Sequence, residues 1–232
     1  MALARISRSM TTVDKRHIGE ISTRSVEHEF PEVDDPESWN PPKLDSKDVY
    51  QPSLIATYRK KILLREVEVV IKISSPSTQI VDLPLFTAED IKQFVAYAKS
   101  KKYNYIHFGG IRVGLAPLFR RGINTPCIVE LFDSRHLTYD HARIGTITGN
   151  LRTGTQYGTI YPDFAISLSD PHLKNAWKML IGVQGLKMAD DSDFVSVIIQ
   201  TSFQLNNTIH PKLRQPVLED CVTTAISIAD SC

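Results

Sequence analysis

The stretch Tyr105–Asp170, YIHFGGIRVGLAPLFRRGINTPCIVELFDSRHLTYDHARIGTITGNLRTGTQYGTIYPDFAISLSD, decides the fold of this 232-residue chain. Its short runs IRVGL, CIVELFD, ARIGTITGNL and FAISL are rich in alternating apolar residues, and Gly, Pro, Asn and Asp separate them. This pattern is typical of β-strands joined by turns. The stretch contains no catalytic signature.

The same alternation continues on both sides of this stretch. In ILLREVEVVIKIS, Leu63, Val67 and Val69 share one face and Glu66 and Glu68 the other, which predicts a long half-buried strand. The turn SSPST follows this strand and leads into QIVDLPLF. Further strands are expected at 103–108, 111–116, 127–133, 143–151, 157–161, 164–169, 176–184 and 194–205. A helix is the alternative for 176–184.

One helix interrupts the strands. Thr87 and Asp90 have the spacing of a capping box, and Ile91, Phe94 and Val95 fall on one face of the helix expected over 88–101. The fold class predicted is therefore all-β with one or two short helices. Short strands at near-regular spacing favour an antiparallel sandwich or barrel.

The ends of the chain differ in composition from its middle. HEFPEVDDPESWNPPKLDSKD is acidic and interrupted by proline, so it buries too little apolar surface to offset chain entropy. We expect residues 1–54 to form a poorly ordered arm, 55–206 to form the β domain and 207–232 to form a tail. The apolar residues between Val217 and Ile228 are compatible with a short docking helix in that tail.

The net charge of +1 conceals a basic middle. Residues 59–152 carry 15 Lys and Arg against 8 Asp and Glu, whereas the segments on either side are each net −3. Such a middle indicates a surface that faces a polyanion, although a solvated charged face is the commoner explanation. The candidates for nucleic-acid contact are Lys99, Lys101, Lys102, Arg112, Arg120, Arg121, Arg143 and Arg152. The three lysines also complement the helix dipole, which is their structural alternative.

The sequence lacks the patterns of catalytic and metal centres. It has no G-x-S-x-G, no Walker loop and no HExxH. The pattern of GGIRVG indicates a strand, in which the glycines permit close approach of a neighbour. His136 and His141 are five residues apart, which does not place two metal ligands on one helix face. We expect no enzyme, no cofactor, no metal and no small-molecule substrate.

The compartment expected from the sequence is the cytoplasm. The start MALARISRSM lacks the apolar region of a signal peptide, and no apolar run approaches the ~18 residues that span a bilayer. Cys127, Cys221 and Cys232 are odd in number and unclustered, which predicts that Cys127 is a buried thiol in a reducing compartment.

Asp133 ends the strand CIVELFD on the same face as Cys127 and Leu131, opposite Glu130. A carboxylate on the apolar side of a strand needs a cation or several N–H donors. Two explanations remain open, an ion pair with Arg135 or a cap on the DSRH turn.

Glycines form a second feature of the middle. Gly145 and Gly149 lie in a strand, where glycine indicates a bulge, a bend or a close neighbour.

Four motifs in this order resemble the thirty-kilodalton superfamily of plant-virus movement proteins. They are HFGGIRVGLAPLFRRGI, VELFDSR, ARIGTITGNLRTG and YPDFAISLSD, and the resemblance covers roughly residues 60–205. The hallmark of this family is an aspartate that ends an LxD-type strand and is followed later by a glycine. Leu131 and Asp133 match the first part, and Gly182 or Gly185 supplies the glycine.

The resemblance implies a jelly-roll fold like that of small-virus capsid proteins. It implies a non-enzymatic protein that binds single-stranded viral nucleic acid without sequence preference and carries the genome through plasmodesmata. The partners implied are further copies of the chain, host endomembrane and plasmodesmatal proteins, and viral coat protein. The implied location is the host cytoplasm, the endomembrane surface and plasmodesmata. The alternative function is a capsid-like protein that packages nucleic acid.

Arg120 and Arg121 lie in the turn LFRRGIN, where two adjacent side chains both reach solvent. If both contact phosphates, replacing both with Gln lowers the slope of log K against log salt by roughly 1.4, at about 0.7 per single-strand contact. Filter binding of single-stranded RNA across a salt series measures this slope. An unchanged slope leaves the pair as a solubilising turn.

Overall fold

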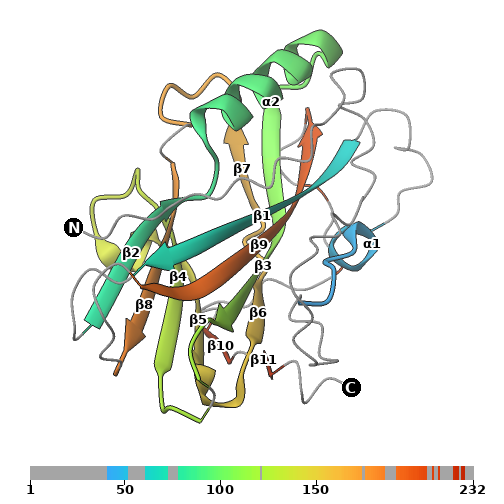
Figure 1. Ribbon diagram of the computed structural model, residues 1–232. Helices are drawn as coiled ribbons and strands as arrows, with labels where there is room; N and C mark the ends of the chain where they lie inside the picture. Colours follow the sequence, from blue (N-terminus) through green and yellow to red (C-terminus); the bar gives the residue numbers. More distant parts are fainter. Residues whose placement is uncertain are drawn as a thin grey trace.

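The computed structural model describes residues 41–51, 61–72, 78–120, 122–173, 176–185 and 192–207, the single residues Pro211 and Arg214, and residues 222–224 and 226–227 (Figure 1). The helical elements are α1 (Ser46–Val49), α2 (Ala88–Lys101), α3 (Tyr139–Ala142) and the 3-10 turn η1 (Leu151–Thr153). The strands are β1 (Lys61–Lys72), β2 (Thr78–Pro84), β3 (Tyr105–Pro117), β4 (Pro126–Asp133), β5 (Arg143–Asn150), β6 (Gln156–Ile160), β7 (Phe164–Ser167), β8 (Trp177–Gln184), β9 (Asp193–Asn206), β10 (Val222–Thr224) and β11 (Ile226–Ser227).

The strands form two sheets. Sheet 1 has the order β1-β9-β3-β6-β11, with β7 beside the start of β3, and sheet 2 has the order β10-β5-β4-β8-β2. All described pairings are antiparallel except that of β10 with β5. The chain crosses repeatedly between the sheets, so β1 lies beside β9 and β2 lies beside β8. This nesting is the jelly-roll order, and it confirms the predicted all-β antiparallel sandwich.

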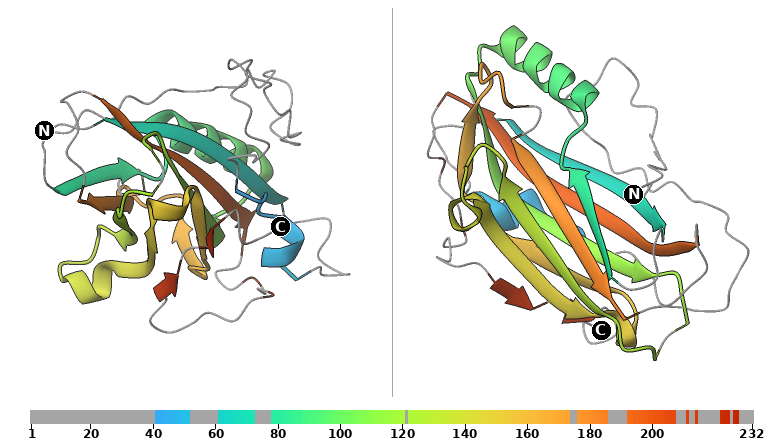
Figure 2. Two further views of the ribbon diagram at one scale, coloured as in Figure 1. Left: turned by 60° about the horizontal axis from the view of Figure 1, so that its bottom comes forward. Right: turned by 90° about the vertical axis from the view of Figure 1, so that its left-hand side faces the viewer.

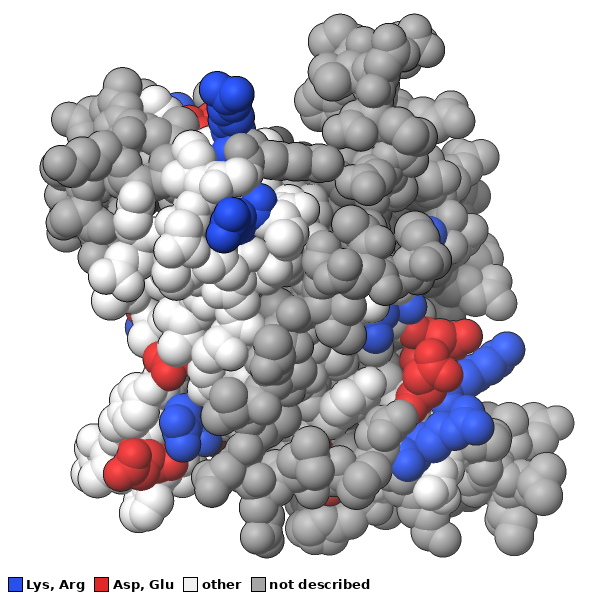
Figure 3. Space-filling model, turned by 90° about the horizontal axis from the view of Figure 1, so that it is seen from below, with Lys and Arg blue, Asp and Glu red and all other residues white. Residues whose placement is uncertain are grey.

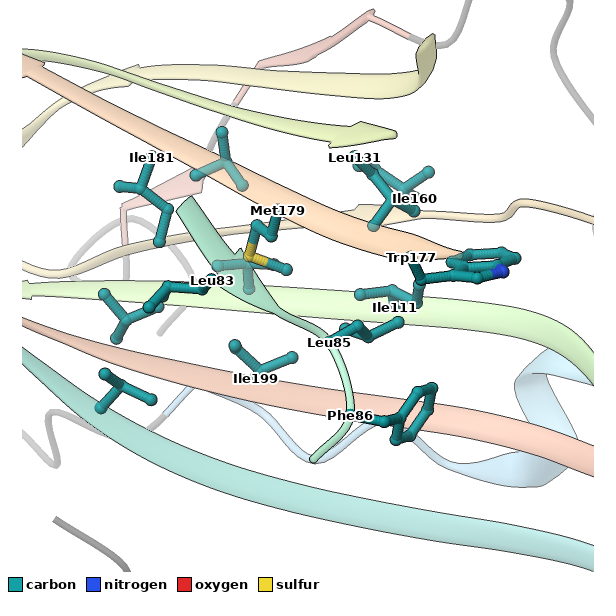
Figure 4. Packing of buried hydrophobic residues seen from close by; sticks show 14 of the residues in the cluster. Leu83, Leu85, Phe86, Ile111, Leu131, Ile160, Trp177, Met179, Ile181 and Ile199 are labelled. Carbon is teal, nitrogen blue, oxygen red and sulfur yellow. The ribbon is translucent and has the colours of Figure 1, made fainter. Parts of the chain in front are cut away.

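The core lies between the inner faces of the two sheets. Along β4, Cys127, Val129 and Leu131 are buried, whereas Ile128 on the other face is 38% exposed. Figure 4 shows side chains from sheet 2, such as Met179 and Ile181, packed against side chains from sheet 1, such as Ile111 and Ile199. The rings of Phe108 and Trp177 close one part of this core, with centroids 4.3 Å apart. Strand alternation therefore places the apolar set in the core, as the sequence predicts.

One strand replaces two that were expected. Segments 103–108 and 111–116 belong to the continuous β3, which pairs with β9 along almost its whole length. The register shifts between Phe108 and Gly110, so Gly109 is an extra residue in the strand. A bulge of this kind bends a strand without ending it, which is why the glycine pair is not a turn.

The helix α2 has the predicted capping box. Asp90 N donates to Thr87 Oγ1 over 3.2 Å, and Thr87 N donates to Asp90 Oδ2 over 2.7 Å. The same carboxylate forms an ion pair with Arg65 of β1, 2.6 Å away, and Phe94 packs on Phe203 of β9. These contacts hold α2 at one end of the sandwich (Figures 1 and 2).

Two further segments for which a helix was considered form strands. Residues 177–184 form β8 and not a helix. The docking helix considered for the tail is wrong for Val222–Thr224 and Ile226–Ser227, which form β10 and β11. Val, Thr and Ile in VTTAIS are β-branched and favour extended backbone. Val217, Leu218 and Ile228 lie outside the described residues.

The N-terminal arm expected over 1–54 is described only at 41–51. Leu44, Val49 and Tyr50 of this part are buried and form a small cluster with Tyr161, separate from the main core. The remainder of that arm, including Trp39, lies outside the described residues.

Gly158 of β6 marks a place where the two sheets come close. A Cβ placed there lies 2.5 Å from Cγ2 of Ile147 in β5. We expect Gly158→Ala to lower the free energy of unfolding by about 1–3 kcal/mol through overpacking. Combining it with Ile147→Ala relieves the clash, so the double variant is more stable than the sum of the two single effects. Urea unfolding measures this coupling, and strict additivity contradicts the clash.

Candidate functional site

The C-terminal end of β4 holds a buried carboxylate. Asp133 is 2% exposed and lies opposite Trp177 of β8. Its Oδ1 accepts hydrogen bonds from the backbone N of Arg135 over 3.1 Å and from Arg135 Nε over 2.8 Å, and its Oδ2 accepts from Arg135 NH2 over 2.6 Å. The ion pair and the turn cap considered from the sequence therefore coexist in one residue.

Arg135 joins this carboxylate to the loop between β7 and β8. Its NH1 donates to Asp170 Oδ2 over 2.7 Å, and its guanidinium lies over the ring of Phe164 at 5.3 Å. Asp170 also accepts from the backbone N of His172 over 2.8 Å. A planar guanidinium suits this arrangement because it donates in several directions at once.

The electrostatics of the cluster favour its ionised state. Burial raises the pKa of Asp133, but the hydrogen bonds and charge of Arg135 outweigh it and hold that pKa below its ordinary value. The backbone hydrogen bond from His172, together with Arg135, lowers the pKa of Asp170. A fully partnered carboxylate with a lowered pKa is a poor proton acceptor at neutral pH. The arrangement therefore fits a structural clamp better than acid–base chemistry.

The glycines of the family motif lie in the strands around β4. Gly145 pairs with the fully buried Leu131, and Gly149 pairs with Cys127. Gly182 lies in β8 between Ile128 and Ile80, on the outer face of sheet 2. Gly185 follows β8 with φ of 97°, a conformation that favours glycine. The choice between Gly182 and Gly185 as the family glycine stays a prediction.

The candidate basic residues fall into separate groups. Lys99 and Lys101 are exposed in the last turn of α2, and Lys102 caps it with φ of 59°. Arg120 and Arg152 are exposed at the opposite end of β3, on two loops that are joined by a hydrogen bond from Gly122 N to Arg152 O over 3.0 Å. A strand of thirteen residues such as β3 spans about 40 Å, so the two groups lie at opposite ends of the sandwich. Arg121 lies outside the described residues.

Two other candidates are already engaged within the fold. Arg112 Nε donates to Thr159 Oγ1 over 2.8 Å and its NH1 donates to Pro42 O over 2.6 Å, on the outer face of sheet 1. Arg143 lies over the ring of Tyr139 at 5.9 Å. The structure therefore does not gather the seven described candidates into one patch. Seen from below, the Lys and Arg side chains of the described residues form small separate groups, some of them beside Asp or Glu (Figure 3).

The outer face of sheet 1 carries a feature that sequence reasoning missed. Residues 41–51 lie on it, and Val49 and Tyr50 pack directly over Gly109. The glycines of GGIRVG were expected to permit close approach of a neighbour, and the approaching groups are side chains of this segment. The adjacent glycines were the only signal, because nothing local pairs them with residues 41–51, some sixty positions earlier.

No group of three or more His, Cys, Asp or Glu side chains in the described part of the chain is arranged to hold a metal ion. None of its helices is long and apolar enough to cross a membrane.

Comparison with known sequences identifies relatives. A family model described as viral movement protein matches residues 44–215. The genome polyprotein of Petunia vein clearing virus (isolate Shepherd) is 33% identical over 116 residues, which cover 50% of this chain and 5% of the polyprotein. The movement protein of Cauliflower mosaic virus (strain Strasbourg) is 26% identical over 180 residues, which cover 72% of this chain and 55% of the relative. The chain thus spans about half the length of that movement protein and a small part of the polyprotein.

Solved structures of virus proteins are also similar. A chain of Desmodium yellow mottle tymovirus matches with a TM-score of 0.42 and 11% identity, over 78% of this chain and 97% of that one. A chain of tobacco necrosis virus matches with a TM-score of 0.41 and 10% identity, over 64% of this chain and 96% of that one.

Replacement of Asp133 tests the clamp. We expect Asp133→Ala to lower the free energy of unfolding by roughly 1–3 kcal/mol or more, because Arg135 loses its buried partner. Asp133→Asn keeps an acceptor for the backbone of Arg135, so its cost is smaller. The exposed Asp140 in the same loop region provides the control, Asp140→Asn, with little effect.

The pH dependence of the same variants has a defined sign. The pKa of Asp133 is lowered in the folded state. The ionised carboxylate therefore contributes fully to folding stability above the unfolded pKa of about 3.9, and this contribution is lost as the pH falls through the folded pKa. Urea unfolding at several pH values should show that the free energies of unfolding of the wild type and Asp133→Asn differ at neutral pH and converge at acid pH. Equal melting temperatures at neutral pH argue against any special role for Asp133.

Proposed function

This chain belongs to the viral movement protein family, and from that premise we propose that it binds single-stranded viral nucleic acid and carries the genome from cell to cell through plasmodesmata. The observation that carries the proposal is the family match over 44–215, because this range includes nearly all of the jelly-roll sandwich. Relatives from Petunia vein clearing virus and Cauliflower mosaic virus support a plant-virus setting. The protein acts by binding and not by catalysing a reaction.

The end of the sandwich that carries Arg120 and Arg152 is the first contact surface for nucleic acid. Asn150 holds the two loops together, since its Oδ1 accepts from Thr125 N over 3.2 Å and from Arg152 N over 3.0 Å. Within the described part of the chain, neither guanidinium has an acidic partner. Exposed arginines on a rigid turn contact phosphates without reading bases, which gives binding that is independent of sequence.

The end of α2 supplies a second contact. Lys99, Lys101 and Lys102 are exposed there and, in the described chain, also have no carboxylate partner. A single strand that touches both groups spans the distance of about 40 Å between the two ends of the sandwich. Arg112 and Arg143 contribute less, since contacts within the protein already occupy their guanidinium groups.

The proposal extends to partners and location. Copies of the chain, host endomembrane and plasmodesmatal proteins, and viral coat protein are the partners. The protein works in the host cytoplasm, at the endomembrane surface and at plasmodesmata. Family membership supports each of these, and localisation in leaf cells tests the location directly.

The jelly-roll order of the strands favours a second candidate function, a capsid-like protein that packages nucleic acid. A fluorescent fusion in leaf epidermis separates the two. Paired puncta across walls and spread into neighbouring cells support movement, and Asp133→Ala should abolish that spread through loss of folding or assembly. Closed isometric particles in purified protein, without spread, support packaging.

Charge substitution tests the contact surface. Replacing Arg120 and Arg152 with Gln should lower the log–log salt slope for single-stranded RNA by up to about 1.4, at ~0.7 per phosphate, with no change in melting temperature. The matched control is Arg112→Gln, which should leave the slope unchanged and lower the melting temperature, because Arg112 bonds to Thr159 and Pro42. If Arg112→Gln lowers the slope and replacement of Arg120 and Arg152 does not, the nucleic acid lies on the outer face of sheet 1.

A further inference from the structure

The outer face of sheet 1 is polar and nevertheless buried. Ser196, Gln200, Ser202 and Gln204 of β9 all point away from the core, and none is more than 5% exposed. Outward polar residues of an antiparallel sheet ordinarily face water. Part of the cover is the segment Pro41–Gln51, here called the strap, which includes α1 (blue in Figure 1).

At three glycines of β3, side chains of the strap occupy the space that a Cβ atom would take. A Cβ on Gly109 lies 2.6 Å from atoms of Tyr50 and Val49, and one on Gly110 lies 3.1 Å from Val49. A Cβ on Gly114 lies 2.9 Å from Cγ of Pro41. Any other residue at Gly109 or Gly114 collides with the strap, so the surface of β3 is shaped to this segment.

The backbone of the strap is held as well. Leu44 N donates to Gln200 Oε1 over 2.9 Å, and Pro42 O accepts from Arg112 NH1 over 2.6 Å. Both holding side chains are themselves fixed, since Gln200 Nε2 donates to Glu66 Oε2 over 2.9 Å and Arg112 Nε donates to Thr159. Polar side chains that bond a peptide backbone beside pockets for its side chains make a peptide-binding groove.

Tyr50 anchors the end of the strap. Its hydroxyl donates to His107 O over 3.0 Å and lies 3.1 Å from His107 Nδ1, and His107 Nε2 lies 3.0 Å from Asp163 Oδ1. Burial raises the pKa of Tyr50 well above its ordinary value, so the phenol is neutral. A buried tyrosine whose hydroxyl is bonded combines a large apolar contact with a directional one.

The strap and the sandwich are separable. Leu44, Val49 and Tyr50 form a cluster of their own, and the main core cluster between the sheets contains no side chain of the strap. Nine residues, 52–60, lie between Gln51 and the start of β1. Lys61 of β1 pairs with Leu205, and His107 under Tyr50 pairs with Gln204, so the strand under Tyr50 and β1 are two strand spacings apart, about 10 Å.

We propose that this groove also binds the strap of a second copy of the chain, so that copies associate by exchanging residues 41–51. The strap is the one peptide whose fit to the groove is demonstrated, and every copy carries it. Exchange in both directions closes a twofold dimer, and exchange in one direction links copies in series. This inference rests on the groove and is independent of nucleic-acid binding.

Concentration decides between the two arrangements. The contacts are the same within one chain and between chains, so the balance depends on the effective concentration that the covalent connection gives to the strap of the same chain. Dilute protein therefore keeps its own strap. Protein crowded into an assembly exchanges it.

A cysteine pair tests the exchange. The built Cβ of Gly114 lies 3.4 Å from Cβ of Pro41, close to the ~3.5–4.5 Å of a disulfide. Full-length chains carry Cys221→Ser and Cys232→Ser; Cys127 stays, because burial raises the pKa of its thiol to about 12. The double variant Pro41→Cys/Gly114→Cys should close within one chain and report that the groove is as described.

Mixing the two single variants forces the bond to form between chains. We expect a disulfide-linked heterodimer whose yield rises with protein concentration, several-fold above a control pair of Pro41→Cys with the exposed Thr138→Cys. Adding Tyr50→Ala to the Pro41→Cys chain should return the yield to the control level. A yield equal to the control, with normal closure of the double variant, overturns exchange, and failure of the double variant to close overturns the groove.

A second measurement needs no substitution. Sedimentation of the wild-type chain up to millimolar concentration should show a dimer that a synthetic peptide of residues 41–51, PPKLDSKDVYQ, returns to monomer. A chain that stays monomeric throughout, or a dimer that the peptide does not affect, contradicts the proposal.

Discussion

The pairing of β9 between β1 and β3 is the constraint on which the rest of the structure depends. β9 is buried on both faces, with apolar groups toward the core and mostly polar groups on the opposite side. Val195, Val197 and Phe203 meet the inner face of sheet 2, whereas Gln200 bonds Glu66 and the strap. A polar group buried without partners is costly, so the outer residues require a specific cover. The jelly roll and the groove are thus two consequences of one strand.

Much of the fold could be predicted from local pattern because strand alternation and capping are local. The parity of CIVELFD placed Asp133 on the buried face, and the Thr87–Asp90 spacing located the start of α2. Prediction failed where distant residues decide the outcome. β3 was divided at Gly109 because a bulge held by β9 looks like a break in a single sequence. Residues 222–224 and 226–227 form strands because β5 and β6 offer edges to pair with.

The candidate site was harder to predict for the same reason. Composition identified the basic residues of the middle, but only the topology separates the end of α2 from the Arg120–Arg152 loops. Arg112 has the charge of a nucleic-acid contact, but its guanidinium donates hydrogen bonds to Thr159 of sheet 1 and to Pro42 of the strap. Asp133 shows the converse, because a two-residue spacing to Arg135 was enough to indicate its partner.

The position of β1 has a consequence for how the protein forms. Its residue Glu66 bonds Gln200, 134 positions later, and the whole length of β1 pairs with β9. Such non-local pairing must overcome a large loop-closure entropy before the contacts between the strands stabilise it. Folding is therefore slow compared with that of helical domains. During synthesis β1 waits for β9, and the two strands pair fully only after Asn206 has left the ribosome. Until then the apolar face of β1 is open to chaperones and to other nascent chains.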